Sequence, residues 1–208
     1  IGTALLLTIA AGYAAGTSKG FASIILSLFF IACLFLTIFF LLFFRDPERR
    51  PKGEEEDAVS PADGKVISID KRTISIFMNI HNVHVNRAPL GGTVTHIDYK
   101  PGGYIPAFDK DSLVNERNHI VLSTGHGILE LTQIAGILTR RIVSYISEGN
   151  IVKRGERIGM IRFGSRVDVV VPEGYEFVVG VNENVRAGET VMAIMKEKKG
   201  ERNEREHL

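Results

Sequence analysis

The chain has 208 residues and a formal charge of +1, but its charged side chains are unevenly distributed. Residues 1–44 contain one of them, Lys19, so all 24 acidic and 24 of the 25 basic residues lie in 45–208. Residues 45–208 therefore carry balanced charge and have no basic stripe, which argues against nucleic acid as a partner. The single cysteine, Cys33, excludes an internal disulfide and a cysteine-based metal site.

Two apolar segments come first in the chain. Residues 21–44 are uncharged and rich in Phe, Leu and Ile, and as a helix they extend about 36 Å, enough to cross a membrane. Residues 1–17 are shorter and rich in Ala and Gly, which fits either a signal-peptide core or a helix packed closely on another helix. We predict a transmembrane helical hairpin over 1–44. The basic residues that follow it place the next domain on the cytoplasmic side of the membrane: Arg45, Arg49, Arg50 and Lys52.

The rest of the chain predicts a polar linker, 45–57, and a β-rich catalytic domain, 58–208. Short β-branched runs recur there at intervals of 8–12 residues, separated by Gly, Pro, Asn and Asp, the pattern of a β-sandwich or barrel. Only residues 107–117 have a helical pattern. The segment 152–158 returns at 185–191 with a Gly-Glu turn in each copy, which suggests the pseudo-symmetric barrel-sandwich of biotinyl and lipoyl carrier domains.

Two histidines three residues apart, His81 and His84, are the first candidates for chemistry. In a strand they would face opposite sides, whereas in a tight turn they could share a site. Zinc would need further ligands at clear spacing, and the other histidines show none, so we predict no metal. Two imidazoles acting as separate acid and base fit better, because histidine titrates near neutral pH. Structural histidines remain an alternative.

Three further motifs can be turns or site elements. Asp63, in Ser-Pro-Ala-Asp-Gly-Lys-Val, either makes a plain turn or points inward as a partner for a histidine. Asn-Glu-Arg at 115–117 is either a surface turn or a loop that shapes a pocket.

The Gly164-Ser165 pair is either a plain turn or a reactive peptide bond. If the bond is strained, the serine hydroxyl can attack the preceding carbonyl. Elimination and hydrolysis would then leave a pyruvoyl group at 165, an electron sink for amine substrates.

The order of these motifs, ending in Lys-Arg-Gly-Glu-Arg-Ile-Gly-Met-Ile-Arg-Phe-Gly-Ser at 153–165, resembles the phosphatidylserine decarboxylases. It is similar to their short, compact branch, which includes an archaeal archaetidylserine decarboxylase counterpart. The resemblance implies cleavage between Gly164 and Ser165 into a β chain, 1–164, and an α chain, 165–208. It also implies a pyruvoyl group derived from Ser165 without metal or pyridoxal phosphate, and decarboxylation of a serine-headgroup phospholipid to the ethanolamine lipid.

The same resemblance assigns roles to single residues. Asp63 would orient His84, His84 would activate the Ser165 hydroxyl, and His81 would place the proton on Cα after CO2 leaves. Arg166 departs from the family pattern, in which Thr or Ser often follows the Gly-Ser pair. Because it lies next to the pyruvoyl group, we expect it to hold an anionic carboxylate or phosphate. The apolar character of the loop 101–108, independent of the resemblance, suggests that two of its aromatic residues either enter the lipid bilayer or belong to the β core: Tyr104 and Phe108.

Two other functions fit parts of the pattern. A membrane-tethered barrel-sandwich adaptor explains the repeat but leaves Asp63 and the histidines without a role. A membrane-anchored hydrolase would use Ser165 with His84 and Asp63 and would need no cleavage. The sequence does not decide whether the lipid substrate is ester-linked or ether-linked. It also leaves the oligomeric state open, and a homodimer is one option.

Overall fold

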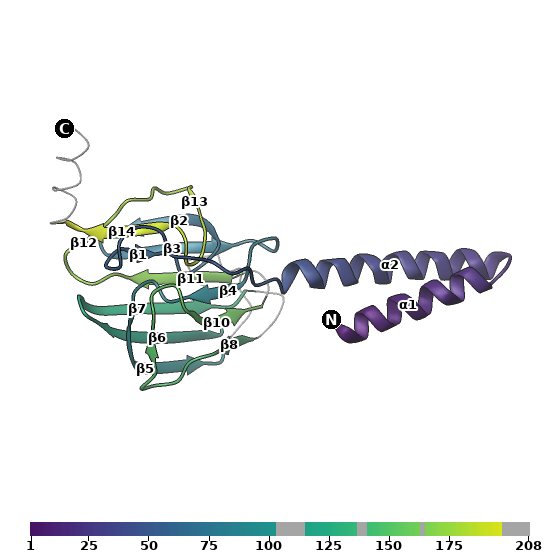
Figure 1. Cartoon of the computed structure of the whole chain (residues 1–208), viewed down its shortest axis with the longest axis horizontal. Coiled ribbons are helices and arrows are strands. Elements are labelled where there is room, and N and C mark those ends of the chain that lie inside the picture. The colour runs from purple at the N-terminus through teal and green to yellow at the C-terminus, as the bar shows by residue number, and fades with distance from the viewer. Residues whose placement is uncertain (103–114, 137–140, 163–164, 197–208) are drawn as a thin grey trace. The chain divides into compact units, whose positions relative to one another are not determined.

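The computed structural model describes residues 1–102, 115–136, 141–162 and 165–196. The chain divides into two compact units, Ile1–Arg45 and Asp46–Leu208 (Figure 1). Three residues singled out from the sequence lie outside the described residues: Tyr104, Phe108 and Gly164.

The first unit is the predicted helical hairpin, α1 (Gly2–Thr17) and α2 (Phe21–Phe43). The helices pack through small and polar groups: the hydroxyls of Thr8 and Thr37 lie 2.9 Å apart, and Gly12 faces the ring of Phe30. Among the described helices, α2 alone is long and apolar enough to cross a membrane, with a mean hydropathy of 3.0. Helix α1 is apolar but shorter.

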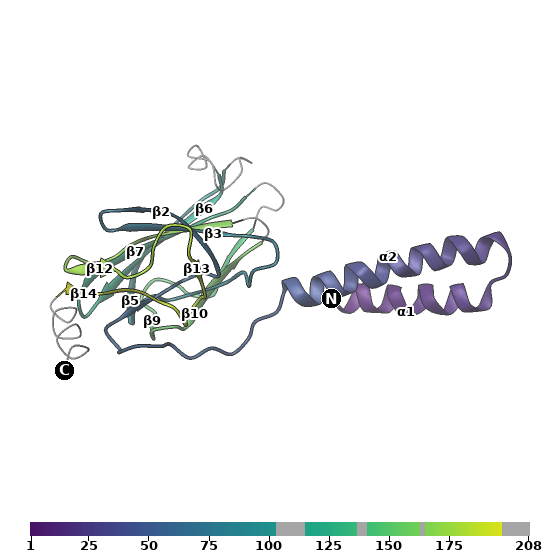
Figure 2. The ribbon, with the colours of Figure 1, turned by 90° about the horizontal axis from the view of Figure 1, so that it is seen from above.

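In its described residues the second unit is built of antiparallel β-strands, which confirms the predicted mainly β class. Eight strands form one curled sheet in the order β13-β2-β3-β11-β7-β6-β5-β9, and two three-stranded sheets, β1-β14-β12 and β4-β10-β8, complete the unit (Figures 1 and 2). The strands are β1 (Ala58–Val59), β2 (Gly64–Asp70), β3 (Thr73–Met78), β4 (Val85–Arg87), β5 (Gly92–Lys100), β6 (Arg117–Thr124), β7 (Gly127–Ile134), β8 (Ile142–Ser144), β9 (Ile151–Val152), β10 (Arg157–Ile161), β11 (Ser165–Val170), β12 (Tyr175–Phe177), β13 (Asn184–Val185) and β14 (Val191–Met195).

The inner face of the large sheet carries the hydrophobic core. Alternate residues of β11 are buried, and Val167 lies opposite Ile76 of β3 on one side and Gln133 of β7 on the other. Strict alternation along neighbouring strands directs these side chains to the same face. The core of this face is built from Ile74, Ile76, Ile120, Leu122, Leu129, Leu131, Val167 and Val169.

The sequence repeat is also a structural repeat. Gly155 and Gly188 have φ angles of +77° and +70°, which glycine adopts without steric cost, and each turn leads into a strand, β10 or β14. Gly155 N–H donates to the carbonyl of Ala88, and Gly188 N–H donates in the same way to the carbonyl of Ser60. The two Gly-Glu turns therefore dock equivalent strands, as in a pseudo-symmetric barrel-sandwich.

Residues 46–57, which make up all but the first residue of the predicted linker 45–57, contain no helix or strand but are bound tightly to the β-structure. We call them the strap. Asp46 pairs with Arg157 at 2.5 Å and with Arg87 at 3.2 Å. Arg154 is buried and donates to two strap carbonyls, those of Lys52 and Asp57. The strap thus belongs to the second unit.

Candidate active site

Ser165 is the first residue of β11 and lies opposite Met78, the last residue of β3. It is fully buried, and it shares the inner face of the sheet with Val167. Its Oγ atom has no hydrogen-bond partner among the described residues. Buried hydroxyls are normally hydrogen-bonded, so this unpartnered hydroxyl is an exception that calls for an explanation.

Glycine at 64 explains how the Ala-Asp-Gly motif reaches this end of the sheet. Gly64 begins β2, and the next residue, Lys65, lies opposite Phe77. A side chain at 64 would collide with the Phe77 carbonyl oxygen. Close backbone approach therefore requires glycine here, and it places Asp63 at the end of the sheet where Met78 and Ser165 meet.

The carboxylate of Asp63 is buried and accepts four hydrogen bonds. Arg49 of the strap donates two of them, through Nη1 to Oδ1 and through Nη2 to Oδ2, the latter at 2.9 Å. The backbone N–H groups of Ala187 and Val83 supply the others, at 2.8 and 3.4 Å. None of these described contacts of Asp63 is to the His84 ring. Asp63 contacts the residue that precedes His84 in the chain.

Arg49 ties the strap to this carboxylate and to the C-terminal segment. Its side chain is 7% exposed and that of Asp63 is 11% exposed. Arg49 Nη1 also donates to the Ala187 carbonyl at 2.9 Å, so the ion pair binds both the N–H and the C=O of that residue. The hydrogen bond to Asp63 raises the pKa of Arg49. Such a charge-assisted pair is stronger than neutral hydrogen bonds.

The two histidines differ in burial. His84 is fully buried, and its Nδ1 atom lies 2.9 Å from the carbonyl oxygen of Asn82. A carbonyl can only accept, so Nδ1 carries the hydrogen, and in the neutral ring Nε2 holds the lone pair. His81 is exposed, in a turn closed by the hydrogen bond from Asn82 N–H to the Asn79 carbonyl. This turn begins directly after Met78, the residue opposite Ser165.

A row of buried amides leads toward Met78, the residue opposite Ser165, and was not predicted from the sequence. Asn118 donates to Gln133 at 3.0 Å, and Gln133 donates to Asn86 at 2.8 Å. Asn86 in turn lies 3.6 Å from the Met78 sulfur. All three amide side chains are buried. The signal that could have found them is a polar residue at a core-facing strand position, because Gln133 continues the alternate buried positions of Leu129 and Leu131 along β7.

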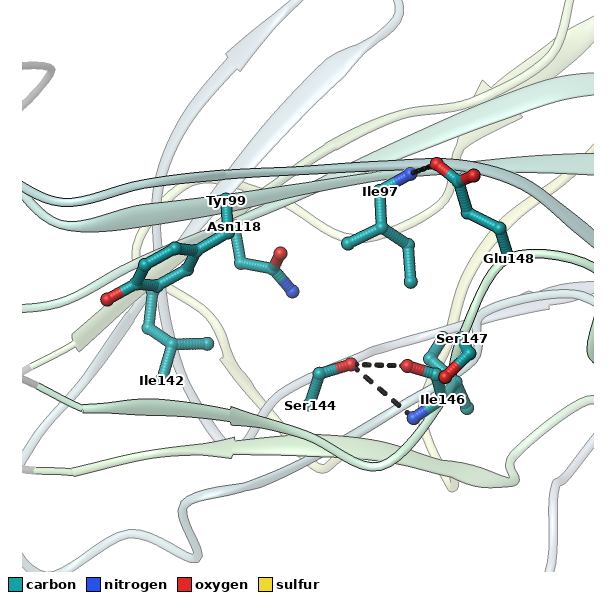
Figure 3. A pocket seen from close by; sticks show the side chains of 8 residues that line it. All are labelled: Ile97, Tyr99, Asn118, Ile142, Ser144, Ile146, Ser147 and Glu148. Atoms are coloured by element: carbon teal, nitrogen blue, oxygen red, sulfur yellow. Dashed lines mark hydrogen bonds between the residues drawn. The ribbon is translucent and has the colours of Figure 1, made fainter.

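The Asn-Glu-Arg motif is not a surface turn, because Asn115 and Glu116 are buried. Glu116 is buried, and its carboxylate accepts from Tyr99 Oη at 2.9 Å and from Ile142 N–H at 3.0 Å. The hydrogen bond to Glu116 raises the pKa of Tyr99. A cavity of about 340 Å³ lies beside this contact (Figure 3), lined by Ile97, Tyr99, Asn118, Ile142, Ser144, Ile146, Ser147 and Glu148.

Arg166 lies on the other face of β11 from Ser165, because neighbouring residues of a strand alternate. Its guanidinium group pairs with Asp168, at 2.6 and 2.8 Å. We therefore do not include it in the proposed substrate site. In the described parts of the chain, no group of three or more His, Cys, Asp or Glu side chains could hold a metal ion.

Known proteins match most of the chain. The sequence profile of the family described as phosphatidylserine decarboxylase matches residues 36–193. A "Putative archaetidylserine decarboxylase proenzyme" of Methanococcoides burtonii is 52% identical over 167 residues, 80% of each chain. A "Phosphatidylserine decarboxylase proenzyme" of Streptomyces griseus is 53% identical over 155 residues, 72% of this chain and 71% of its own.

Among solved structures, the peptidase lysostaphin of Staphylococcus simulans covers 71% of this chain and 53% of its own, with 12% identity. Its TM-score of 0.34 is too low to bear on the fold or the site. The family profile and the relatives at more than 50% identity carry the assignment. This chain belongs to the phosphatidylserine decarboxylase family.

Proposed function

We propose that the protein is a self-processing, pyruvoyl-dependent decarboxylase that converts a serine-headgroup membrane phospholipid to the ethanolamine lipid and CO2. Relatives named for phosphatidylserine and for archaetidylserine support this substrate class, and their names as proenzymes support cleavage of the chain. The observation that carries the proposal is the buried Ser165 hydroxyl without a partner among the described residues, at the predicted cleavage site.

In the cleavage step, His84 Nε2 takes the proton of the Ser165 hydroxyl, and the oxygen attacks the carbonyl carbon of Gly164. The C–N bond breaks, the nitrogen takes the proton, and an ester joins the two residues. Loss of the Cα proton of residue 165 expels the Gly164 carboxylate and leaves dehydroalanine. Tautomerisation to an imine and hydrolysis release ammonia and leave a pyruvoyl group on the small chain, 165–208.

Asp63 acts on His84 through the backbone in this proposal. Its carboxylate holds the N–H of Val83, and the Asn82 carbonyl accepts the Nδ1–H of His84. The carboxylate therefore fixes the segment that sets the tautomer of the ring. Asp63 is a positioning residue, and its partner Arg49 holds it in place.

A bound pyruvoyl ketone supplies the electron sink for loss of CO2 from the serine headgroup. His81 is exposed at the turn next to Met78, where a substrate can reach it, and in our proposal it delivers the proton to Cα of the product. We keep the prediction that Tyr104 and Phe108 contact the lipid.

The hairpin of the first unit serves as a membrane anchor in this proposal. Helix α2 has the length and hydropathy of a membrane span, and the strap of the β unit starts three residues after α2 ends. An anchored domain meets its lipid substrate at high effective concentration. The excess of basic residues after α2 favours the cytoplasmic face for the β unit.

Denaturing gel electrophoresis of the purified full chain tests the proposed function. Self-cleavage yields fragments of 164 and 44 residues, and Ser165→Ala abolishes it. Ser75→Ala is the matched control, because Ser75 is also a buried serine, in the adjacent strand β3. An adaptor would remain one intact chain. A serine hydrolase would remain intact and react with a fluorophosphonate at Ser165.

A further inference from the structure

The cavity of Figure 3 lies between the inner face of β5 and β6 and the segment from β8 to residue 148. Ile97 and Asn118 project into it from the large sheet, toward Ser144 and Ile146 on the opposite wall. Its volume of about 340 Å³ is in the range of sites for small ligands.

The walls of the cavity are mainly apolar, and several polar groups are already bonded. Ser144 Oγ donates to the carbonyl of Ile146 at 2.8 Å, and the Glu148 carboxylate accepts from Ile97 N–H at 2.8 Å. Among the described lining residues there is no Lys or Arg, and the one charged group is an anion. Such a lining disfavours a phosphate and favours a hydrocarbon chain.

A buried carboxylate holds the two walls of the cavity together. Glu116 accepts from Tyr99 of β5 and from the backbone of Ile142 in β8, so it joins the large sheet to the smaller one. An occupant does not have to order these walls, which lowers the cost of binding.

The register of the sheet gives the position of the cavity relative to Ser165. Asn118 lies opposite Gln133, and Gln133 lies opposite Val167, two residues from Ser165. Two strand spacings across the sheet and two residues along β11 separate Asn118 from Ser165 by about 12 Å. Both side chains face inward. An extended phosphoserine headgroup with its glycerol spans such a distance.

We propose that this cavity binds the first part of a hydrocarbon chain of the lipid substrate while the serine amine reacts at position 165. The inference rests on the proposed function and adds a second binding site to it. The row of buried amides runs from Asn118, which lines the cavity, to Asn86, which lies next to Met78. The cavity then recognises the hydrocarbon chain of the lipid substrate, whereas the group at residue 165 recognises the amine of its headgroup.

The test compares two substrates: a serine-headgroup lipid in mixed micelles, and glycerophosphoserine, which has no hydrocarbon chain. Ile97→Trp fills the cavity from the sheet, and Ser147→Trp fills it from the exposed rim without disturbing the core. Ile128→Trp, at a half-exposed position near the far end of β7, is the matched control. Displacing two methylene groups from the cavity lowers kcat/KM for the lipid about tenfold.

The expected result is this tenfold fall for both cavity variants on the lipid, with unchanged kcat/KM on glycerophosphoserine and unchanged self-cleavage. Ile128→Trp behaves like the wild type on both substrates. Unchanged activity on the lipid overturns the inference, and so does an equal fall on both substrates, which would indicate a distorted reaction centre. A wild-type chain that cleaves but decarboxylates neither substrate overturns the proposed function itself, and the inference with it.

Discussion

Replacing Arg49 by methionine tests the structural basis of the site. The change removes the guanidinium group and leaves the Asp63 carboxylate buried without its cation. Breaking a buried ion pair from one side costs about 3–5 kcal/mol. Asp63 keeps two backbone donors, those of Ala187 and Val83, so we expect the lower end of this range, about 3 kcal/mol. Self-cleavage slows because the segment before His84 loses its anchor.

The free energy of unfolding is measured on the full chain in detergent, by urea denaturation followed with pulse proteolysis. A Ser165→Ala background keeps every chain uncleaved. The double variant Arg49→Met/Asp63→Asn removes both charges, and we expect a coupling energy of about 2 kcal/mol between the two sites. Arg154→Met is the matched control, since Arg154 is also buried and also binds the strap, but through carbonyls.

Additive effects of Arg49→Met and Asp63→Asn would refute the reasoning, because independent sites do not couple. The same coupling between Arg154→Met and Asp63→Asn would also refute it, since the effect would then come from loosening the strap in general. Partial rescue of cleavage by Arg49→Lys, with unchanged cleavage in Arg154→Met, would support the specific role of the ion pair.

Two further predictions concern the frame of the site. Gly64→Ala forces its Cβ against the Phe77 carbonyl, and we expect the free energy of unfolding in urea to fall by about 2 kcal/mol or more. Gly125→Ala is the control: its Cβ meets open space, so its free energy of unfolding should stay within about 0.5 kcal/mol of the wild type. Tyr99 has a pKa raised above its ordinary value of 10.0, chiefly by the hydrogen bond to Glu116. This contribution to stability is complete below pH 10 and is lost as pH rises through the raised pKa. Glu116→Leu removes the acceptor, so we expect it to flatten the alkaline decline and to bring the absorbance titration of Tyr99 back toward 10.

The sequence was sufficient to predict the main elements of the fold. Alternating apolar residues bounded by turn residues predicted the β-domain, and the repeat of the Gly-Glu turn predicted its pseudo-symmetry, since Gly155 and Gly188 make equivalent contacts. The helical hairpin followed from two apolar runs. These features depend on local patterns, which a single sequence displays directly.

The partner of Asp63 could not be predicted in the same way. Arg49 lies in a polar stretch that has the composition of a linker, and only the folded chain shows it buried against the carboxylate. The tautomer of His84 depends on the Asn82 carbonyl, a backbone group that leaves no mark in the sequence. The position of Arg166, in contrast, was predictable, because residues next to each other in a strand face opposite sides.

The intact mass of the small fragment tests the central claim most directly. The proposed function predicts a fragment of residues 165–208 that begins with a pyruvoyl group, lighter by one ammonia molecule than the same fragment with an N-terminal serine. Reduction with borohydride in the presence of an amine should then couple the amine to this fragment. A fragment with an ordinary serine amino terminus, or a chain that stays intact, would contradict the account.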